Sequence, residues 1–82
     1  MTMNLTPEQL QQYITQGLLC THLTVEGDGQ HFFATIVSNE FNGLRAIQRH
    51  KKVYDVLGDR MREEIHALSM KTLTPQEWNT QK

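Results

Sequence analysis

The stretch that decides the fold runs from Phe41 to Trp78 and reads FNGLRAIQRHKKVYDVLGDRMREEIHALSMKTLTPQEW. Its first part predicts a long helix, because apolar residues and one lysine recur at helical spacing. These residues are Leu44, Ile47, Lys51, Tyr54 and Leu57, with Ala46, Val53 and Val56 beside them. Gly58 ends this helix, and Asp59 can cap a further short turn. The apolar run 66–70 then predicts a strand that begins at His66.

The last part of this stretch repeats a helix-start signal that also occurs near the N-terminus. In residues 73–78, Thr74 is the expected N-cap and Glu77 the third helical residue, and this spacing of threonine and glutamate forms a capping box. In residues 5–10, Thr6 and Gln9 have the same arrangement. Both segments therefore predict helix starts, and the one at residues 5–10 opens a helix of about three turns.

Two strands are expected between the first helix and the long one. From Leu19 the apolar period becomes two, which predicts a strand with one buried face and one wetter face. The buried face would hold Leu19, Leu23 and Val25, and the wetter face Cys20, His22, Thr24 and Glu26. After a Gly-Asp-Gly turn at 27–29, a strand follows His31. Its residues 32–37 are apolar on both faces, so we expect a middle strand covered on both sides.

The expected order of elements is helix, strand, strand, helix, short helix, strand, short helix (αββααβα). The connection between the second and third strands is long enough for a right-handed crossover, which makes these strands parallel. With the helices on one face, we predict an α+β fold in which a three-stranded mixed sheet packs against helices. Residues 1–82 would form one domain, with flexible ends at 1–4 and 79–82. Parallel pairing would bring His31 and His66 to one edge of the sheet, where two imidazoles can form half of a metal site.

The composition indicates a small cytoplasmic protein. The chain has 82 residues, of which 38% are hydrophobic and 21% charged, and its formal net charge is −1 at pH 7. We expect no membrane association, because the sequence has no apolar run of about 18 residues and no basic-then-apolar leader. A near-neutral chain attracts nucleic acid only through a local patch. The single cysteine, Cys20, can neither form an internal disulfide nor bind an iron–sulfur cluster alone.

Three segments of the chain together resemble the BolA family, and more closely its short, IbaG-like bacterial subgroup. They are VEGDGQHF at 25–32, VSNEFNGLRAIQRHKKVY at 37–54 and IHALSMKTLTPQEW at 65–78. The resemblance implies a class II KH-like (BolA-like) fold. It also implies a monothiol glutaredoxin as partner, with which a glutathione-ligated 2Fe–2S cluster is shared in a heterodimer. Alone, the protein would carry no cluster and be a monomer or weak homodimer.

The resemblance also implies which side chains bind the cluster. In the family the histidine of the third-strand motif is a ligand, and it matches His66. The second ligand comes from the hairpin loop, where the match is His31; Cys20 does not match that position. Both histidines also have a simpler interpretation. His66, at a strand start, can be structural, and His31, after a Gly-Asp-Gly turn, can be a solvated loop residue.

A basic cluster on the long helix, formed by Arg45, Arg49, Lys51 and Lys52, has three readings. It can be the solvated side of the helix, a dock for a partner protein, or a nucleic-acid surface suggested by the KH-like fold. KH modules clamp the backbone of nucleic acid with a GxxG loop, and the corresponding turn here has one glycine, Gly43, which weakens the third reading. An enzyme is not expected, since the sequence has no triad signature, Gly-rich phosphate loop or paired-carboxylate motif.

Overall fold

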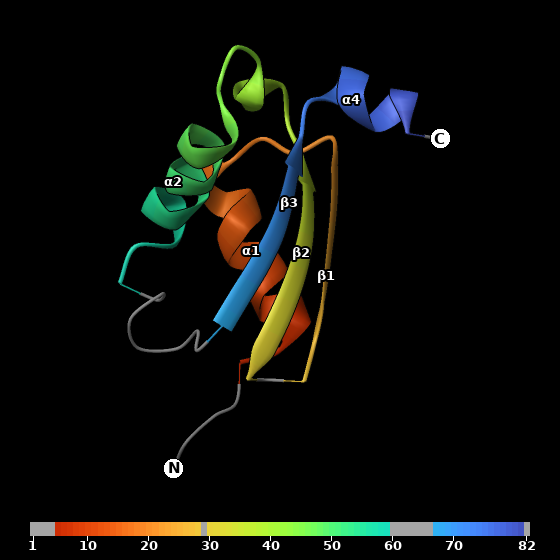
Figure 1. Cartoon of the computed structure of the whole chain (residues 1–82). Coiled ribbons are helices and arrows are strands. Elements are labelled where there is room, and N and C mark those ends of the chain that lie inside the picture. Colours follow the sequence, from red (N-terminus) through yellow and green to blue (C-terminus); the bar gives the residue numbers. More distant parts are fainter. Residues whose placement is uncertain (1–4, 29, 60–66, 82) are drawn as a thin grey trace.

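The computed structural model describes residues 5–28, 30–59 and 67–81, and its elements follow the predicted α+β pattern (Figure 1). Their order is α1 (Pro7–Gly17), β1 (His22–Gly27), β2 (His31–Val37), the 3-10 turn η1 (Asn39–Phe41), α2 (Ala46–Leu57), β3 (Ala67–Leu73) and α4 (Pro75–Thr80). In Figure 1, α1 and α2 lie together on one face of the sheet. The predicted short turn after Asp59, and with it His66, lies outside the described residues.

The sheet is mixed, as predicted, with the strand order β1-β2-β3. β1 pairs antiparallel with β2, and Val25 is opposite Ala34. β2 pairs parallel with β3, so that His31 is opposite Ala67 and Val37 is opposite Leu73. The parallel pairing and the central place of β2 are therefore confirmed.

The two helix-start signals are confirmed as capping boxes. The Thr6 hydroxyl accepts a hydrogen bond from the Gln9 N–H at 3.1 Å, and the Gln9 side chain accepts one from the Thr6 N–H at 3.0 Å. Thr74 and Glu77 exchange the same pair of bonds at the start of α4. Such caps satisfy N–H groups that have no partner inside the helix. α4 continues through Thr80, so Asn79 and Thr80 are helical, and the predicted flexibility of residues 79–82 stays a prediction.

The core lies between the sheet and helices α1 and α2. Its buried residues come from every layer: Leu5, Leu10, Ile14, Leu18, Phe32, Ala34, Ile36, Phe41, Val53 and Leu57. The prediction that β2 is covered on both sides is wrong, since Phe33 is 48% exposed. Its side chain alternates with those of Phe32 and Ala34, which face the helices, and therefore points to the open face of the sheet.

Two other apolar positions differ from the prediction. Leu19, expected on the buried face of the first strand, is 80% exposed, because β1 begins only at His22 and Leu18 fills the core instead. On α2, Ile47 is 77% exposed, whereas Val53 and Leu57 are completely buried. The buried side of the helix thus includes Leu57 from the predicted spacing and Val53 from beside it, but not Ile47. In the described part of the chain, no helix is long and apolar enough to span a membrane.

Candidate functional site

His31 stands at the edge of the sheet where β2 and β3 both begin. It is exposed, it is the first residue of β2, and its backbone is in register with Ala67, the first residue of β3. Because the strands are parallel, side chains at their first residues share one edge of the sheet. His66 precedes Ala67 in the sequence and lies outside the described residues, so its predicted role as a ligand stays a prediction.

The hairpin turn before His31 is built around the carboxylate of Asp28. Its Oδ1 atom accepts hydrogen bonds from the backbone N–H groups of Gln30 and His31, both at 3.0 Å. These two bonds stabilise the ionised form and hold the pKa of Asp28 below its usual value. The Asp28 N–H also donates to the His31 carbonyl at 3.2 Å. Asp28 therefore orients the backbone that carries the imidazole of His31.

Asp28 was not among the predicted site residues, although the sequence contains a signal for it. An aspartate between two glycines often bonds to backbone N–H groups two residues on and forms an Asx turn. We had assigned Gly-Asp-Gly only to a turn. Its contribution to the site is to fix where the following strand, and thus His31, begins.

Of the two predicted metal ligands, the structure describes His31. Among the residues that the structure describes, no three His, Cys, Asp or Glu side chains are grouped closely enough to hold a metal ion. A neutral imidazole such as that of His31 can nevertheless replace a thiolate on one iron of a 2Fe–2S cluster. For this edge to hold a metal, further ligands would have to come from outside the described residues.

Cys20 does not add a thiolate to this edge. It lies just before Thr21, whose N–H donates to the Val37 carbonyl at 2.8 Å, so it is near the other end of β2. Six residues of strand separate the two ends, which is roughly 20 Å. Burial, followed by the charge of Glu40, raises the pKa of the half-buried thiol to about 11. A thiol in this state is a poor ligand at neutral pH.

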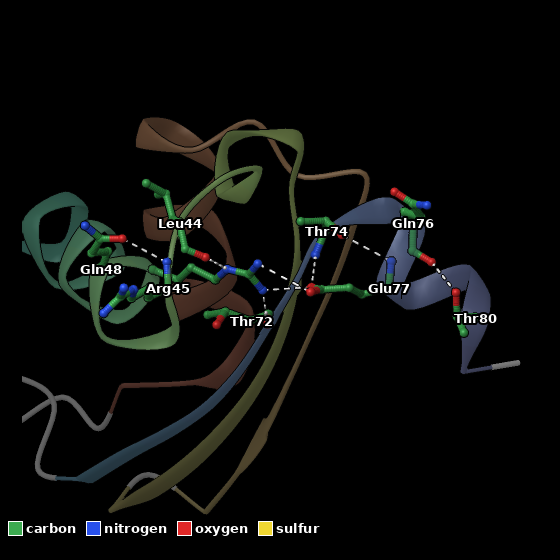
Figure 2. A network of polar contacts seen from close by, with 9 residues as sticks. Leu44, Arg45, Gln48, Thr72, Thr74, Gln76, Glu77 and Thr80 are labelled. Atoms are coloured by element: carbon green, nitrogen blue, oxygen red, sulfur yellow. Dashed lines mark hydrogen bonds and ion pairs between the residues drawn. The ribbon is translucent and has the colours of Figure 1, made fainter.

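The basic cluster of α2 is divided by the structure, because Arg49 is turned inward. Its side chain is 13% exposed, and it donates to the Leu44 carbonyl at 2.9 Å and to the Thr72 carbonyl at 3.2 Å. It also forms an ion pair of 2.7 Å with Glu77 of α4. Figure 2 shows Leu44, Thr72 and Glu77, whose oxygen atoms accept hydrogen bonds from this guanidinium. Arg49 thus connects α2, β3 and α4, and its guanidinium has little surface left for a partner.

The other three cations of the cluster remain at the surface. Lys51 pairs with Asp55 one turn away at 3.0 Å, and both side chains are largely exposed. Lys52 lies 3.5 Å from Glu40. The hydrogen bond from the Leu19 N–H, followed by the nearby Lys52, lowers the pKa of the Glu40 carboxyl. Arg45 is exposed at the N-terminus of α2. Two of the three positive charges are therefore partly neutralised by neighbouring carboxylates.

The two remaining histidines lie away from the His31 edge. His22 was expected to face outward, but it is half-buried, and its ring stacks on that of Trp78 with a centroid distance of 4.4 Å. This contact joins β1 to α4. His50 is half-buried on α2. We assign neither residue to the metal site.

Comparison with known proteins gives matches to BolA-like proteins. The family of BolA-like proteins matches residues 1–77 of the chain. The DNA-binding transcriptional regulator BolA of Haemophilus influenzae is 38% identical over 60 residues, which cover 73% of this chain and 58% of that protein. The chain thus spans little more than half of this relative's length. Protein BOLA2 of Arabidopsis thaliana is 41% identical over 78 residues, covering 89% of this chain and 83% of the plant protein.

Solved structures agree with these sequence matches. The structure of a BolA protein homologue from Coxiella burnetii matches this chain with a TM-score of 0.85 at 42% identity. The match covers 92% of this chain and 97% of the Coxiella chain. The arrangement of three strands and their helices is therefore common to this chain and that homologue.

Proposed function

The chain belongs to the family of BolA-like proteins, and from this premise we propose that it shares a glutathione-ligated 2Fe–2S cluster with a monothiol glutaredoxin. In this role it takes part in the trafficking or regulation of iron–sulfur clusters in the cytoplasm. The cluster is cargo of the heterodimer, and no substrate is turned over. His31 and His66 are the proposed ligands from this chain.

The observation that carries the proposal is the position of His31. Its imidazole is exposed, its backbone is held by Asp28, and it is in parallel register with the first residue of β3. An imidazole on a rigid strand start can meet a partner with little loss of conformational entropy. His66, the other proposed ligand, comes directly before Ala67, the first residue of β3, in the sequence.

The composition of the chain explains why a partner is needed. A 2Fe–2S cluster takes four ligands, usually thiolates, and two of them can be histidines on one iron. Cys20, the one cysteine, has a raised pKa and lies near the other end of β2. In the proposed complex, a cysteine of the glutaredoxin and the thiolate of glutathione supply the two remaining ligands.

The test is visible absorption and circular dichroism of this protein mixed with cluster-loaded monothiol glutaredoxin and glutathione. We expect a new chiral spectrum that is lost in His66→Ala and lost or altered in His31→Ala. Two matched controls, Cys20→Ser and His22→Phe, change a thiol and an imidazole far from the proposed edge and should keep the spectrum. If the spectrum of the mixture equals the sum of the spectra of the separate proteins, and size exclusion shows no complex, the proposal is wrong.

Nucleic-acid binding is the alternative, because the Haemophilus relative is named a DNA-binding transcriptional regulator. The exposed cations Arg45, Lys51 and Lys52 are the candidate contacts, although carboxylates pair with two of them. A protein that neutralises Z phosphates loses affinity with a slope of roughly −0.9Z in log salt. Titration with duplex DNA at two salt concentrations therefore tests this role. Absence of binding at the lower concentration would dismiss it.

A further inference from the structure

A polar cleft lies at the end of the sheet opposite to His31. Its volume is about 530 Å³, within the range of roughly 300–1,000 Å³ that is usual for ligand sites. Its lining residues belong to the segment around η1 and to α4, which stand together at one end of the molecule in Figure 1. They are Asn39, Asn42, Pro75, Gln76, Asn79 and Thr80.

The topology of the sheet creates this cleft. η1 follows the carboxyl end of β2 and α4 follows the carboxyl end of β3, and these two strands are parallel neighbours. A hydrogen bond of 3.0 Å from the Ser38 N–H to the Leu73 carbonyl joins the chain at the carboxyl ends of β2 and β3. In open α/β sheets, ligands bind outside the carboxyl ends of parallel strands. The cleft has the same position in this smaller sheet.

Both walls of the cleft are held in place by the rest of the fold. The η1 wall is anchored by Phe41, which is completely buried, and by the Ser38 hydroxyl, which accepts from the Glu40 N–H at 3.1 Å. The α4 wall is anchored by the capping box at Thr74 and by the ion pair between Arg49 and Glu77 (Figure 2). Preorganised walls lower the entropic cost of binding.

The chemistry of the lining is unusually uniform. Asn39, Asn42, Gln76 and Asn79 carry exposed carboxamides, and none of these groups is hydrogen-bonded to another residue of the described part of the chain. The Thr80 hydroxyl, by contrast, donates to the Gln76 carbonyl at 2.8 Å. Each carboxamide offers an N–H donor and a C=O acceptor. No lining residue is charged or aromatic.

We propose that this cleft binds an extended peptide segment of a partner protein through the main chain of that segment. Each peptide unit presents one N–H and one C=O group, which match the donor and the acceptor of a carboxamide. Nucleotides fit less well, because their binding sites use cations for phosphate and aromatic side chains for base stacking. The cleft is independent of the proposed cluster site, which lies at the opposite end of β2.

The test is titration of the ¹⁵N-labelled full chain with the blocked peptide acetyl-trialanine N-methylamide, with adenosine as the comparison ligand. We expect saturable shifts in the backbone and side-chain amide signals of the lining residues with the peptide. Loss of one hydrogen bond in Asn42→Ala should weaken the affinity roughly 2- to 12-fold. Gln16→Ala, an exposed carboxamide on α1, is the matched control and should leave the affinity unchanged.

Three results would overturn the proposal: no saturable shift with the peptide, equal affinity in Asn42→Ala, or adenosine binding in the cleft without peptide binding. Asn79→Ala supplies the same comparison from the other wall if Asn42→Ala fails to fold. The cluster spectrum reports on the His31 edge and not on this cleft. A failure of one proposal is therefore distinguishable from a failure of the other.

Discussion

Replacement of Arg49 by methionine should destabilise the protein by about 3 kcal/mol, because Arg49 holds three elements together. Its guanidinium donates to the Leu44 and Thr72 carbonyls and pairs with Glu77. Methionine keeps much of the apolar stem, so the loss comes mainly from the polar contacts. The variant leaves both carbonyl groups without their partner in a part-buried place.

The magnitude follows from how exposed each contact is. A hydrogen bond from a charged group contributes about 1.5–3 kcal/mol, and part burial favours the lower value for each of the two carbonyl contacts. The ion pair adds little, because the Glu77 side chain is 46% exposed and solvent screens it. The carbonyl contacts therefore dominate, with a sum of about 3 kcal/mol.

Urea unfolding of three variants separates these contributions. Arg49→Met should show the full loss, and its thermal midpoint should fall by roughly 12–24 °C. Glu77→Gln keeps an acceptor for the Thr74 N–H and should lose much less stability than Arg49→Met. Lys51→Met, which removes an exposed pair with Asp55, is the control and should lose less than about 0.5 kcal/mol. If Arg49→Met loses no more than Glu77→Gln, the reasoning about the carbonyl contacts is refuted.

Three further predictions concern a cap, acid stability and the thiol. Thr74→Ala should lower the free energy of unfolding by about 1 kcal/mol, and an unchanged urea midpoint would show that the cap does not stabilise α4. Folding lowers the pKa of three carboxyl groups, those of Asp28, Glu40 and Glu77. Their contribution to stability is complete above the pKa of the unfolded chain, which is 3.8 for Asp28 and 4.5 for the two glutamates, and it is lost as the pH falls through the lower pKa of the folded state. The urea midpoint should therefore decline between pH 5 and pH 3 in buffers of equal ionic strength; a level profile would contradict this. Cys20, with a pKa of about 11, should react with a disulfide reagent at pH 8 far more slowly than in the urea-unfolded chain, and equal rates would argue against its raised pKa.

Features that depend on neighbours in sequence were predicted well. The two capping boxes need only a threonine and a Gln or Glu three residues later, and both are present in the structure. The parallel pairing of β2 with β3 followed from the length of the connection between them, and it is confirmed with His31 opposite Ala67. One proposed ligand could therefore be placed at a strand start before the structure was known.

The burial or exposure of individual side chains on α2 was predicted less well. The sequence of α2 has apolar residues on more than one side, and spacing alone did not show that Ile47 would be exposed and Val53 buried. The charge on Arg49 suggested a solvated position, but carbonyl groups and Glu77 satisfy it where α2 meets β3 and α4. The number of suitable partners near a side chain is not visible in a local pattern.

By itself, the sequence determined where α1 and α4 begin, the order and direction of the strands, and the edge at which His31 stands. These properties follow from caps and periodicity, which act over a few residues, and from the length of the connection between β2 and β3. Only the tertiary structure decided that Ile47 on α2 is exposed and that Asn42 and Asn79 line one cleft. The physical reason is that these contacts join segments through the packed fold, and their energies depend on burial and on partners that the chain brings together only when it is folded.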